Sequence, residues 1–356
     1  MATANRVRSC AAAITPTNTS ALRPPAPDGN PVTVFSRVVG WSLPLMPPPL
    51  VRWAAAPYVA GDEPADALDC AAALNRRGLA GTLALLGEEI DSPELATEGT
   101  GLYIDLVDAL ADRGLDCNVS VKLTLLGLKV SRSLCRDHLF ELVTRAEARG
   151  SFVRIDMEDH TCTTATLDLY REAVAASRTR AAVGGPTGSG AGGDAVGVVL
   201  QAYLHRTLAD IAALPERANV RLCKGIYVEP PSVAIQDYGR VRRNFLAALE
   251  ALFDRGAYVG IATHDDYLLR ESAAMVERRD LGGDRYEFQM LLGVTEERRD
   301  RLARAGHRVR IYVPYGRQWY AYSTRRLREN PSIAGHVARA FFLRLMRGQT
   351  GADWGK

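Results

Sequence analysis

Eight short apolar runs, each followed by a helical stretch, constrain the fold of this chain more than any other feature. They occupy residues 81–87, 117–123, 152–158, 196–203, 220–227, 258–264, 286–293 and 309–316. The first halves of the runs are apolar, as expected for strands of a parallel sheet that are buried on both faces. Gly114 and Gly150 stand where the intervening helices should end. Eight strands alternating with helices over about 250 residues predict an α/β fold, a (βα)8 TIM-type barrel.

A doubly wound sheet is the alternative fold. It needs a Gly-rich phosphate turn after its first strand, and "LLGEEIDSPE" provides none. No domain-sized insertion separates the last strands, so a single barrel domain is predicted over residues 51–350. A helical segment, "EPADALDCAAALNRRGL", precedes the first strand as part of an N-terminal helical arm. The Gly-rich stretch at about 178–195 predicts a flexible surface insertion before the fourth strand.

Residues 1–50 are rich in Ala, Ser, Thr and Pro and predict a disordered or loosely packed leader. A transit-like segment and an early start codon are alternative interpretations. The apolar stretch 32–52 is interrupted by prolines, and it is expected either to pack on the barrel or to contact a membrane surface. No apolar run reaches the length of about 18 residues that a membrane-spanning helix needs.

Charge and cysteine content exclude other classes of function. The net charge is +3 with both signs interspersed, which gives no electrostatic case for nucleic acid as a partner. The six cysteines form no CxxC pair and no Cys/His cluster, so no metal site is expected. A reducing compartment follows, and we expect a cytoplasmic protein, with peripheral contact at the inner face of the cell membrane as a further option.

Polar residues follow or close the predicted strands, where a TIM-type barrel carries its chemistry. They are Lys122, Asp156, Glu158, Gln201, Tyr203, Arg221, Lys224, Tyr227, Thr263, His264, Glu287, Gln289 and Tyr312. Each one alone has a structural interpretation, such as a helix cap or a snorkelling lysine. Their convergence on one barrel mouth predicts a site whose edge groups suit a flat polar heterocycle. A basic residue there would stabilise a reduced, anionic flavin.

The segment "YSTRRLREN" follows the last predicted strand. On a helix, Tyr322, Arg325, Arg326 and Glu329 fall within roughly one 100° arc. Two guanidinium groups near the mouth can bind one carboxylate, and Glu329 is placed to hold Arg325. A solvated basic face is the alternative.

These motifs together resemble a known family. "VSVKL", "RIDME", "QAYLHR", "RLCKGIYVEP", "IATHD", "EFQMLLG", "RIYVPYG" and "YSTRRLREN" occur in this order. The set resembles proline dehydrogenase, both the stand-alone bacterial type and the matching domain of the bifunctional proline-utilisation protein. The resemblance covers nearly the whole chain except the first fifty residues and the Gly-rich insertion.

The resemblance implies a distorted (βα)8 barrel that binds FAD non-covalently. It implies oxidation of L-proline to 1-pyrroline-5-carboxylate by hydride transfer to flavin N5, with membrane quinone as the electron acceptor. It assigns Lys122, Asp156, Tyr312, Arg325 and Arg326 to catalysis. Substrate binding is assigned to Lys122, Tyr227, Tyr312, Tyr322, Arg325, Arg326 and Glu329. FAD binding is assigned to Gln201, Arg221, Lys224, Gly225, Tyr227, Thr263, His264, Glu287 and Gln289.

Three alternatives remain open on the sequence. One is a related amine dehydrogenase, such as one that oxidises hydroxyproline, although the bulk of Tyr312 favours proline. Another is a barrel that binds an amino acid or phosphate ligand without redox chemistry. The third is a structural barrel with a solvated arginine face.

Overall fold

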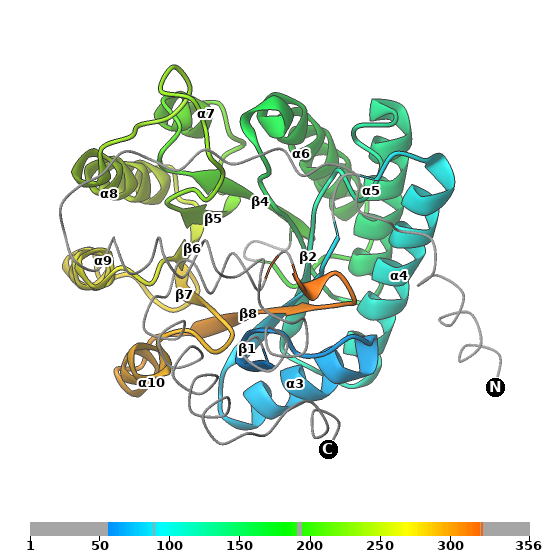
Figure 1. Cartoon of the computed structure of the whole chain (residues 1–356), viewed down its shortest axis with the longest axis horizontal. Helices are drawn as coiled ribbons and strands as arrows, with labels where there is room; N and C mark the ends of the chain where they lie inside the picture. Colours follow the sequence, from blue (N-terminus) through cyan, green and yellow to red (C-terminus); the bar gives the residue numbers. More distant parts are fainter. Residues whose placement is uncertain (1–55, 88–89, 191–193, 321, 323–356) are drawn as a thin grey trace, which may run out of the picture. The chain divides into compact units, whose positions relative to one another are not determined.

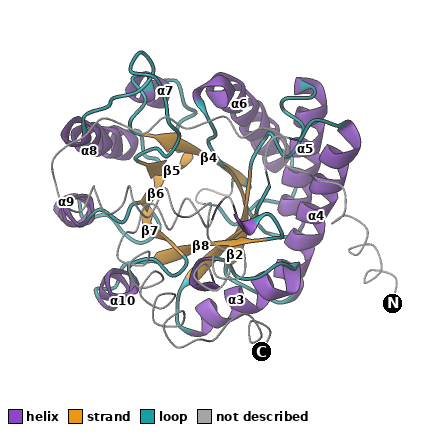
Figure 2. Cartoon of the chain, viewed as in Figure 1, coloured by secondary structure: helices purple, strands orange, loops and turns teal. Residues whose placement is uncertain are grey.

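Eight parallel strands close into a barrel in which each strand pairs with the next and β8 pairs with β1 (Figure 2). The strands are β1 (Ala80–Leu85), β2 (Cys117–Val121), β3 (Val153–Ile155), β4 (Val196–Gln201), β5 (Asn219–Cys223), β6 (Tyr258–Ala262), β7 (Tyr286–Leu291) and β8 (Val309–Tyr315). Each lies within one of the predicted runs or within one residue of it. The (βα)8 barrel is therefore confirmed, and the doubly wound sheet is excluded because a closed sheet has no open edges.

The computed structural model describes residues 56–87, 90–190, 194–320 and 322. Contacts divide the chain into two compact units, one of Pro64–Tyr315 and one of Met1–Glu63 with Gly316–Lys356. The barrel lies in the first unit. In the second unit, the described part includes the short helix η3 (Ala56–Tyr58) and an ion pair between Arg317 and Glu63. The single domain over residues 51–350 stays a prediction.

Helices alternate with the strands and surround the barrel (Figure 1). In the described part of the first unit they are α3 (Pro64–Arg76), α4 (Pro93–Asp112), α5 (Arg132–Ala148), α6 (His160–Ala182), α7 (Thr207–Ala212), α8 (Tyr238–Asp254), α9 (Asp266–Arg278) and α10 (Glu296–Arg304). The helix predicted before the first strand is α3. Gly114 and Gly150 follow the ends of α4 and α5 with φ angles of 61° and 58°, a left-handed conformation that favours glycine.

The helix before the fourth strand extends into the first residues of the predicted Gly-rich insertion. Helix α6 continues to Ala182, so the first residues assigned to the insertion are helical. Arg178 binds Asp194 through two hydrogen bonds of 3.0 and 2.9 Å, and Arg180 binds the buried Glu147 through two of 2.7 and 2.9 Å. These bidentate pairs hold the last turn of α6 against its neighbours, a tertiary effect that composition alone does not reveal.

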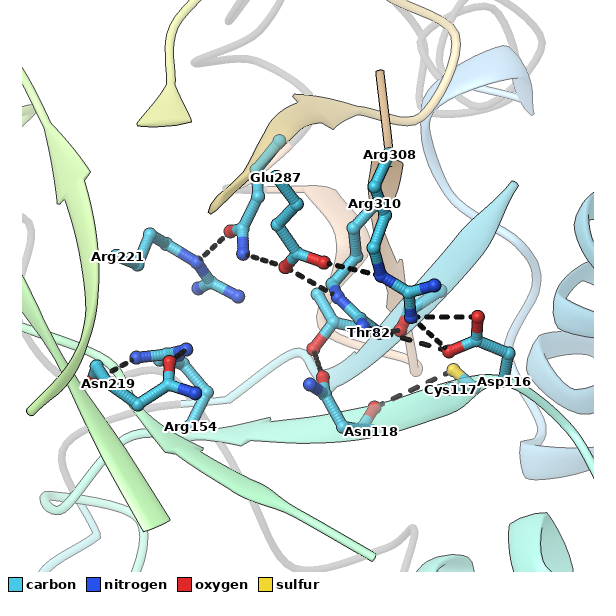
Figure 3. Close-up of polar contacts among 12 residues, drawn as sticks. Thr82, Asp116, Cys117, Asn118, Arg154, Asn219, Arg221, Glu287, Arg308 and Arg310 are labelled. Carbon is cyan, nitrogen blue, oxygen red and sulfur yellow. Dashed lines mark hydrogen bonds and ion pairs between the residues drawn. The ribbon is translucent and has the colours of Figure 1, made fainter. Parts of the chain in front are cut away.

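The inside of the barrel is more polar than the apolar runs suggested. Residues alternate between the two faces of a strand, so in β7 Glu287 and Gln289 face inward while Tyr286, Phe288 and Met290 pack outward. Arg154 on β3 donates to the Asn219 side chain on β5, two strands away (Figure 3). Such contacts cross the barrel interior. Large, fully buried side chains such as Tyr103, Tyr170 and Phe245 lie on the surrounding helices α4, α6 and α8.

Among the described helices, none combines the length and the apolar composition that spanning a lipid bilayer requires.

Candidate active site

Arg221 on β5 lies at the centre of the polar barrel interior. Its side chain is 7% exposed. Its Nε donates to Gln289 Oε1 at 2.5 Å, and its Nη1 donates to Asp156 Oδ1 at 2.7 Å and to Ser120 Oγ at 3.0 Å. The guanidinium also lies over the Tyr312 ring, 5.3 Å from its centroid. Contacts from four other strands or strand ends therefore fix the orientation of this one cation.

Asp156, the residue after β3, joins Arg221 to Tyr312. Its Oδ1 accepts from Arg221 and from the Ser120 hydroxyl, the latter at 2.7 Å. Its Oδ2 accepts from the Tyr312 hydroxyl at 3.2 Å. A buried guanidinium needs such a carboxylate because an unpaired charge in the interior is costly. The geometry brings together three predicted site residues, Asp156, Arg221 and Tyr312, that lie far apart in the sequence.

A second set of ion pairs lies toward the N-terminal ends of the strands. Glu287 accepts from Arg310 Nε at 2.7 Å and from Arg308 Nε at 3.3 Å, and Arg308 also binds Asp116 with two bonds of 2.8 Å. Figure 3 shows this cluster together with Arg221. The amide of Gln289 links the two sets, because its Nε2 donates to Glu287 Oε1 at 2.6 Å.

Glu287 does not lie where the sequence placed it. It is the second residue of β7, close to the N-terminal end of the strand, and both of its carboxylate oxygens bind arginines. Burial opposes its ionisation, but the charges and hydrogen bonds of Arg310, with Arg308 nearby, lower the pKa of Glu287 to about 2. Because arginines occupy both of its carboxylate oxygens inside the barrel, the position of Glu287 favours a role in fixing these arginines over direct contact with a cofactor.

The loop after β5 carries Lys224 and Gly225. Lys224 Nζ donates to Asp265 Oδ2 at 3.3 Å and to the Tyr238 hydroxyl at 3.2 Å. Burial raises the pKa of Asp265, but hydrogen bonds from Arg242 and Tyr238 outweigh burial and hold it well below its usual range. Gly225 has φ +119°, and a Cβ atom there would lie 2.1 Å from the Tyr203 ring. Only glycine therefore allows this backbone path under Tyr203.

His264, two residues after β6, has both ring nitrogens engaged. The Leu291 backbone N–H donates to Nε2 at 3.0 Å, so Nε2 is unprotonated and Nδ1 carries the hydrogen. Nδ1 then donates to Thr295 Oγ1 at 2.9 Å. The imidazole is neutral in this arrangement, and it connects the loops that follow β6 and β7.

The remaining predicted residues of the first unit also lie at or just after strand ends. Gln201 closes β4, is 2% exposed and donates through Nε2 to the Glu158 carbonyl at 2.9 Å. Thr263 directly follows β6 and is buried, with Oγ1 accepting from Asp265 N. Lys122 directly follows β2, and Tyr227 lies in the loop after β5; both are partly buried.

The predicted carboxylate clamp falls mostly outside the described residues. Arg325, Arg326 and Glu329 lie there, so their roles stay predictions. Tyr322 is described as a helical residue, 7% exposed, in the second unit.

Sequence reasoning missed Ser120 and the bridging use of Gln289. Ser120 is 1% exposed and contacts both Asp156 and Arg221. Its place two residues before Lys122 in "VSVKL" was the available signal, because residues two apart share one face of a strand. Another unpredicted contact joins the segments that follow β2 and β3. The Glu158 carboxylate accepts from the Thr124 backbone N–H at 3.0 Å and from the Thr124 hydroxyl at 2.5 Å.

A cavity of about 440 Å³ opens at the other end of the barrel. Its lining comes from the beginnings of strands and includes Asp116, Arg154, Asn219, Glu287 and Arg308. Active sites of TIM-type barrels lie at the C-terminal ends of the strands, so this cavity is not the candidate site. Among the described residues, no group of three or more His, Cys, Asp or Glu could hold a metal ion.

The Arg221 end of the barrel fits a planar ring that is rich in hydrogen-bond acceptors. Arg221 Nη2 is buried and has no hydrogen-bond partner among the described residues. An unsatisfied donor on a fixed cation is costly unless a ligand accepts from it. Gln201, Thr263 and the loop around Lys224 and Gly225 lie at the same ends of neighbouring strands. A flavin, with carbonyl and ring-nitrogen acceptors, has the chemistry that this set would bind.

Comparison with known proteins places the chain in a family. The family model described as proline dehydrogenase matches residues 67–339. The chain is 37% identical over 286 residues to the proline dehydrogenase of Deinococcus radiodurans, covering 79% of this chain and 88% of that protein. It is 33% identical over 289 residues to proline dehydrogenase 1 of Bacillus subtilis, covering 81% of this chain and 90% of that one.

Solved structures with a similar fold include two proline utilization A proteins. Proline utilization A from Bdellovibrio bacteriovorus, in a form inactivated by N-propargylglycine, matches with a TM-score of 0.70, 24% identity and 78% coverage of this chain. Proline utilization A from Bradyrhizobium japonicum, as a D779W mutant, matches with a TM-score of 0.61, 22% identity and 77% coverage. This chain spans 32% and 30% of the length of those two proteins, and the likeness shows the fold.

Proposed function

The chain belongs to the proline dehydrogenase family and is an oxidoreductase, and from this premise we propose that it oxidises L-proline to 1-pyrroline-5-carboxylate using bound FAD. The reaction is the first step of proline catabolism to glutamate, and the electrons pass on to membrane quinone. The observation that carries the proposal is the fixed Arg221 cation, one donor of which has no acceptor among the described residues, in a chain 37% identical to a proline dehydrogenase.

FAD, when bound, supplies the acceptor for a hydride from proline C5. Arg221 would direct Nη2 at the ring and stabilise the negative charge of the reduced form. Gln201, Lys224, Gly225, Thr263 and His264 are proposed to hold the cofactor from the ends of β4, β5 and β6. The neutral His264 adds no charge to that surface.

The substrate is proposed to bind through its carboxylate. Arg325 and Arg326 form bidentate hydrogen bonds to it and Lys122 adds a third cation, while Glu329 holds Arg325. Tyr227, Tyr312 and Tyr322 enclose the ring. Binding of the remote carboxylate orients C5 without any change at the reacting atoms, which is how binding free energy contributes to rate. The amine must be neutral so that its lone pair can form the C=N bond as C5 loses a hydride, and solvent takes the amine proton.

Tyr312 is proposed to select proline over hydroxyproline. Its hydroxyl donates to Asp156, and its ring lies under Arg221. A ring fixed on both sides leaves little room for a substituent on the substrate. Comparing turnover of the two substrates tests this preference.

The purified protein tests the proposal directly. We expect the visible absorbance of an oxidised flavin, bleached by L-proline under anaerobic conditions. N-propargylglycine, which inactivated the Bdellovibrio protein, should inactivate this enzyme irreversibly, with protection by excess proline. A protein without flavin absorbance would instead be a binding barrel without redox chemistry, and the proposal would be wrong.

The carboxylate clamp gives a second test. We predict that Arg326→Met raises the KM for proline about tenfold or more, equivalent to about 1.4 kcal/mol, with unchanged FAD content. Arg317→Met, which removes an exposed arginine paired with Glu63, is the matched control. An unchanged KM at full flavin loading would contradict the clamp.

A cytoplasmic location with peripheral membrane contact is proposed from the use of membrane quinone. The apolar stretch 32–52, which lies outside the described residues, is the candidate for that contact. Co-sedimentation with lipid vesicles, compared with a variant that lacks this stretch, measures it.

A further inference from the structure

We propose that Gln289 is a positioning residue that holds the Arg221 guanidinium beside the cofactor through an amide whose orientation Glu287 imposes. The proposal rests on the proposed function, and it replaces the expectation that Gln289 and Glu287 contact the cofactor themselves. Both residues act through Arg221.

The orientation of the Gln289 amide follows from its two neighbours. Arg221 can only donate hydrogen bonds, and the ionised Glu287 can only accept them. The carbonyl oxygen must therefore face Arg221 Nε, at 2.5 Å, and the NH2 group must face Glu287 Oε1, at 2.6 Å. The flipped amide would place donor against donor and acceptor against acceptor. Glu287 is itself held by Arg310 at 2.7 Å, so the amide has one stable orientation.

Gly260 provides the space in which the amide lies. In the parallel register, Gly260 on β6 pairs with Arg221 on one side and with Glu287 on the other. Because Gly260 has no side chain, a gap remains between Arg221 and Glu287. The amide of Gln289, two residues after Glu287 on β7, fills this gap. A Cβ atom at Gly260 would lie 2.4 Å from Gln289 Nε2 and 2.8 Å from Cδ. Alanine at this position would force the amide out of place.

The bond from Gln289 decides where the last Arg221 donor points. Nη1 is held by Asp156 and Ser120, and Gln289 holds Nε on another edge of the same planar group. Two anchored edges fix the plane, so Nη2 has a single direction. Without Gln289 the guanidinium can rotate about Nη1, and the cation loses its alignment to the ring.

Gln289→Met removes both hydrogen bonds at similar volume. We expect the rate of flavin reduction by proline to fall about tenfold or more, while KM changes less than about twofold, because carboxylate binding is untouched. We also expect the flavin two-electron potential to fall by about 30 mV, which corresponds to a tenfold change in the equilibrium constant. The affinity of the apoprotein for FAD, measured by fluorescence quenching, should weaken.

Gly260→Ala provides an independent displacement of the amide and should reproduce the lower potential although no polar group is lost. Its matched control is Gly99→Ala in α4, where the new Cβ would meet Leu125 Cδ2 at 2.6 Å, a comparable crowding by a flexible side chain on a helix outside the barrel interior. The control should leave the potential unchanged. In an Arg221→Lys background, Gln289→Met should change the rate less than about twofold, since the two residues act as one unit.

The outcomes separate the inference from the proposed function. If the wild-type enzyme binds flavin and oxidises proline while Gln289→Met keeps the wild-type potential and rate, the inference is wrong and the function stands. Additive effects of Gln289→Met and Arg221→Lys would also overturn it, because two residues that act as one unit cannot have additive effects. A wild-type protein that binds no flavin would overturn the proposed function itself.

Discussion

At the scale of single residues, the barrel interior holds several buried charges whose states depend on their partners. Arg154 is 2% exposed and hydrogen-bonds to Asn219 and to backbone carbonyls. Burial, with a contribution from the nearby Arg221, lowers the pKa of Arg154 to about 9. Glu287 is equally buried but is surrounded by arginines, which keep it ionised. Partner charge therefore outweighs burial for Glu287, whereas burial prevails for Arg154.

Glu287 should make acid stability depend on pH. Its pKa is about 2 in the folded protein against an ordinary value of 4.5. A lowered folded-state pKa stabilises the protein above the unfolded value, and this contribution is lost as the pH falls from about 4.5 toward about 2. The contribution is about 3 kcal/mol at neutral pH. We predict that Glu287→Gln lowers the free energy of unfolding at pH 7 and flattens its decline below pH about 4.5.

Urea unfolding between neutral and acidic pH measures this dependence. Asp69→Asn is the control, because Asp69 forms an exposed pair with Arg113 and such pairs contribute about 1 kcal/mol or less. Equal pH profiles for wild type and Glu287→Gln would show that Glu287 is not held ionised.

At the scale of elements, the loops after the strands carry both helix caps and site residues. Ser92 caps α4 by accepting from Leu95 N at 3.2 Å. Asp265 caps α9 by accepting from Tyr267 N at 3.1 Å and also binds Arg242 and Lys224. One carboxylate thus begins a helix and anchors a lysine that is proposed to bind the cofactor.

Substitutions at Asp265 should separate these two roles. Asparagine can still cap the helix, whereas alanine loses the cap and the ion pairs together. We predict that Asp265→Ala is less stable than Asp265→Asn by about 1 kcal/mol, the usual contribution of an N-cap, and that Ser92→Ala costs about the same amount. Chemical unfolding followed by circular dichroism measures all three. Equal stabilities of the two Asp265 variants would mean that the cap contributes nothing.

At the scale of the whole molecule, barrel closure assembles the site. The contact between Arg221 and Asp156 spans 65 residues of sequence, and that between Tyr312 and Asp156 spans 156. The buried Arg221 guanidinium, whose Nη2 has no acceptor in the described part of the chain, is most costly when no ligand is bound. Cofactor binding should therefore stabilise the whole barrel.

With FAD as the proposed cofactor, its removal should lower the melting temperature, and readdition should restore it. At a free FAD concentration about 100 times Kd, the gain in unfolding free energy is about 2.7 kcal/mol. We predict that Arg221→Met reduces this gain by weakening FAD binding. Thermal unfolding over a range of FAD concentrations checks the prediction, and a melting temperature independent of FAD would contradict it.

The eight strands, the barrel and the strand ends at which polar residues gather could all be predicted from the sequence. These follow from local information: apolar runs of strand length, helical periodicity, and glycines such as Gly114 at helix ends. The family motifs added a function for the set. Residue roles were less accessible: the alternation in "YEFQM" places Glu287 and Gln289 on one face, with Glu287 nearer the N-terminal end of the strand, but it does not say which partner each side chain meets.

The hydrogen-bond and ion-pair partners of the polar residues depend on the closed barrel and could not be predicted from local patterns. Glu287 binds arginines on β8 and near it, Gln289 bridges to Arg221, and Ser120 joins Asp156, because barrel closure makes neighbours of residues that no local pattern connects. The same cause extended α6 to Ala182, since its partners Glu147 and Asp194 lie outside the helix. Local propensity fixes an element's type, whereas the partner of a buried charge is set by which strands meet across the barrel.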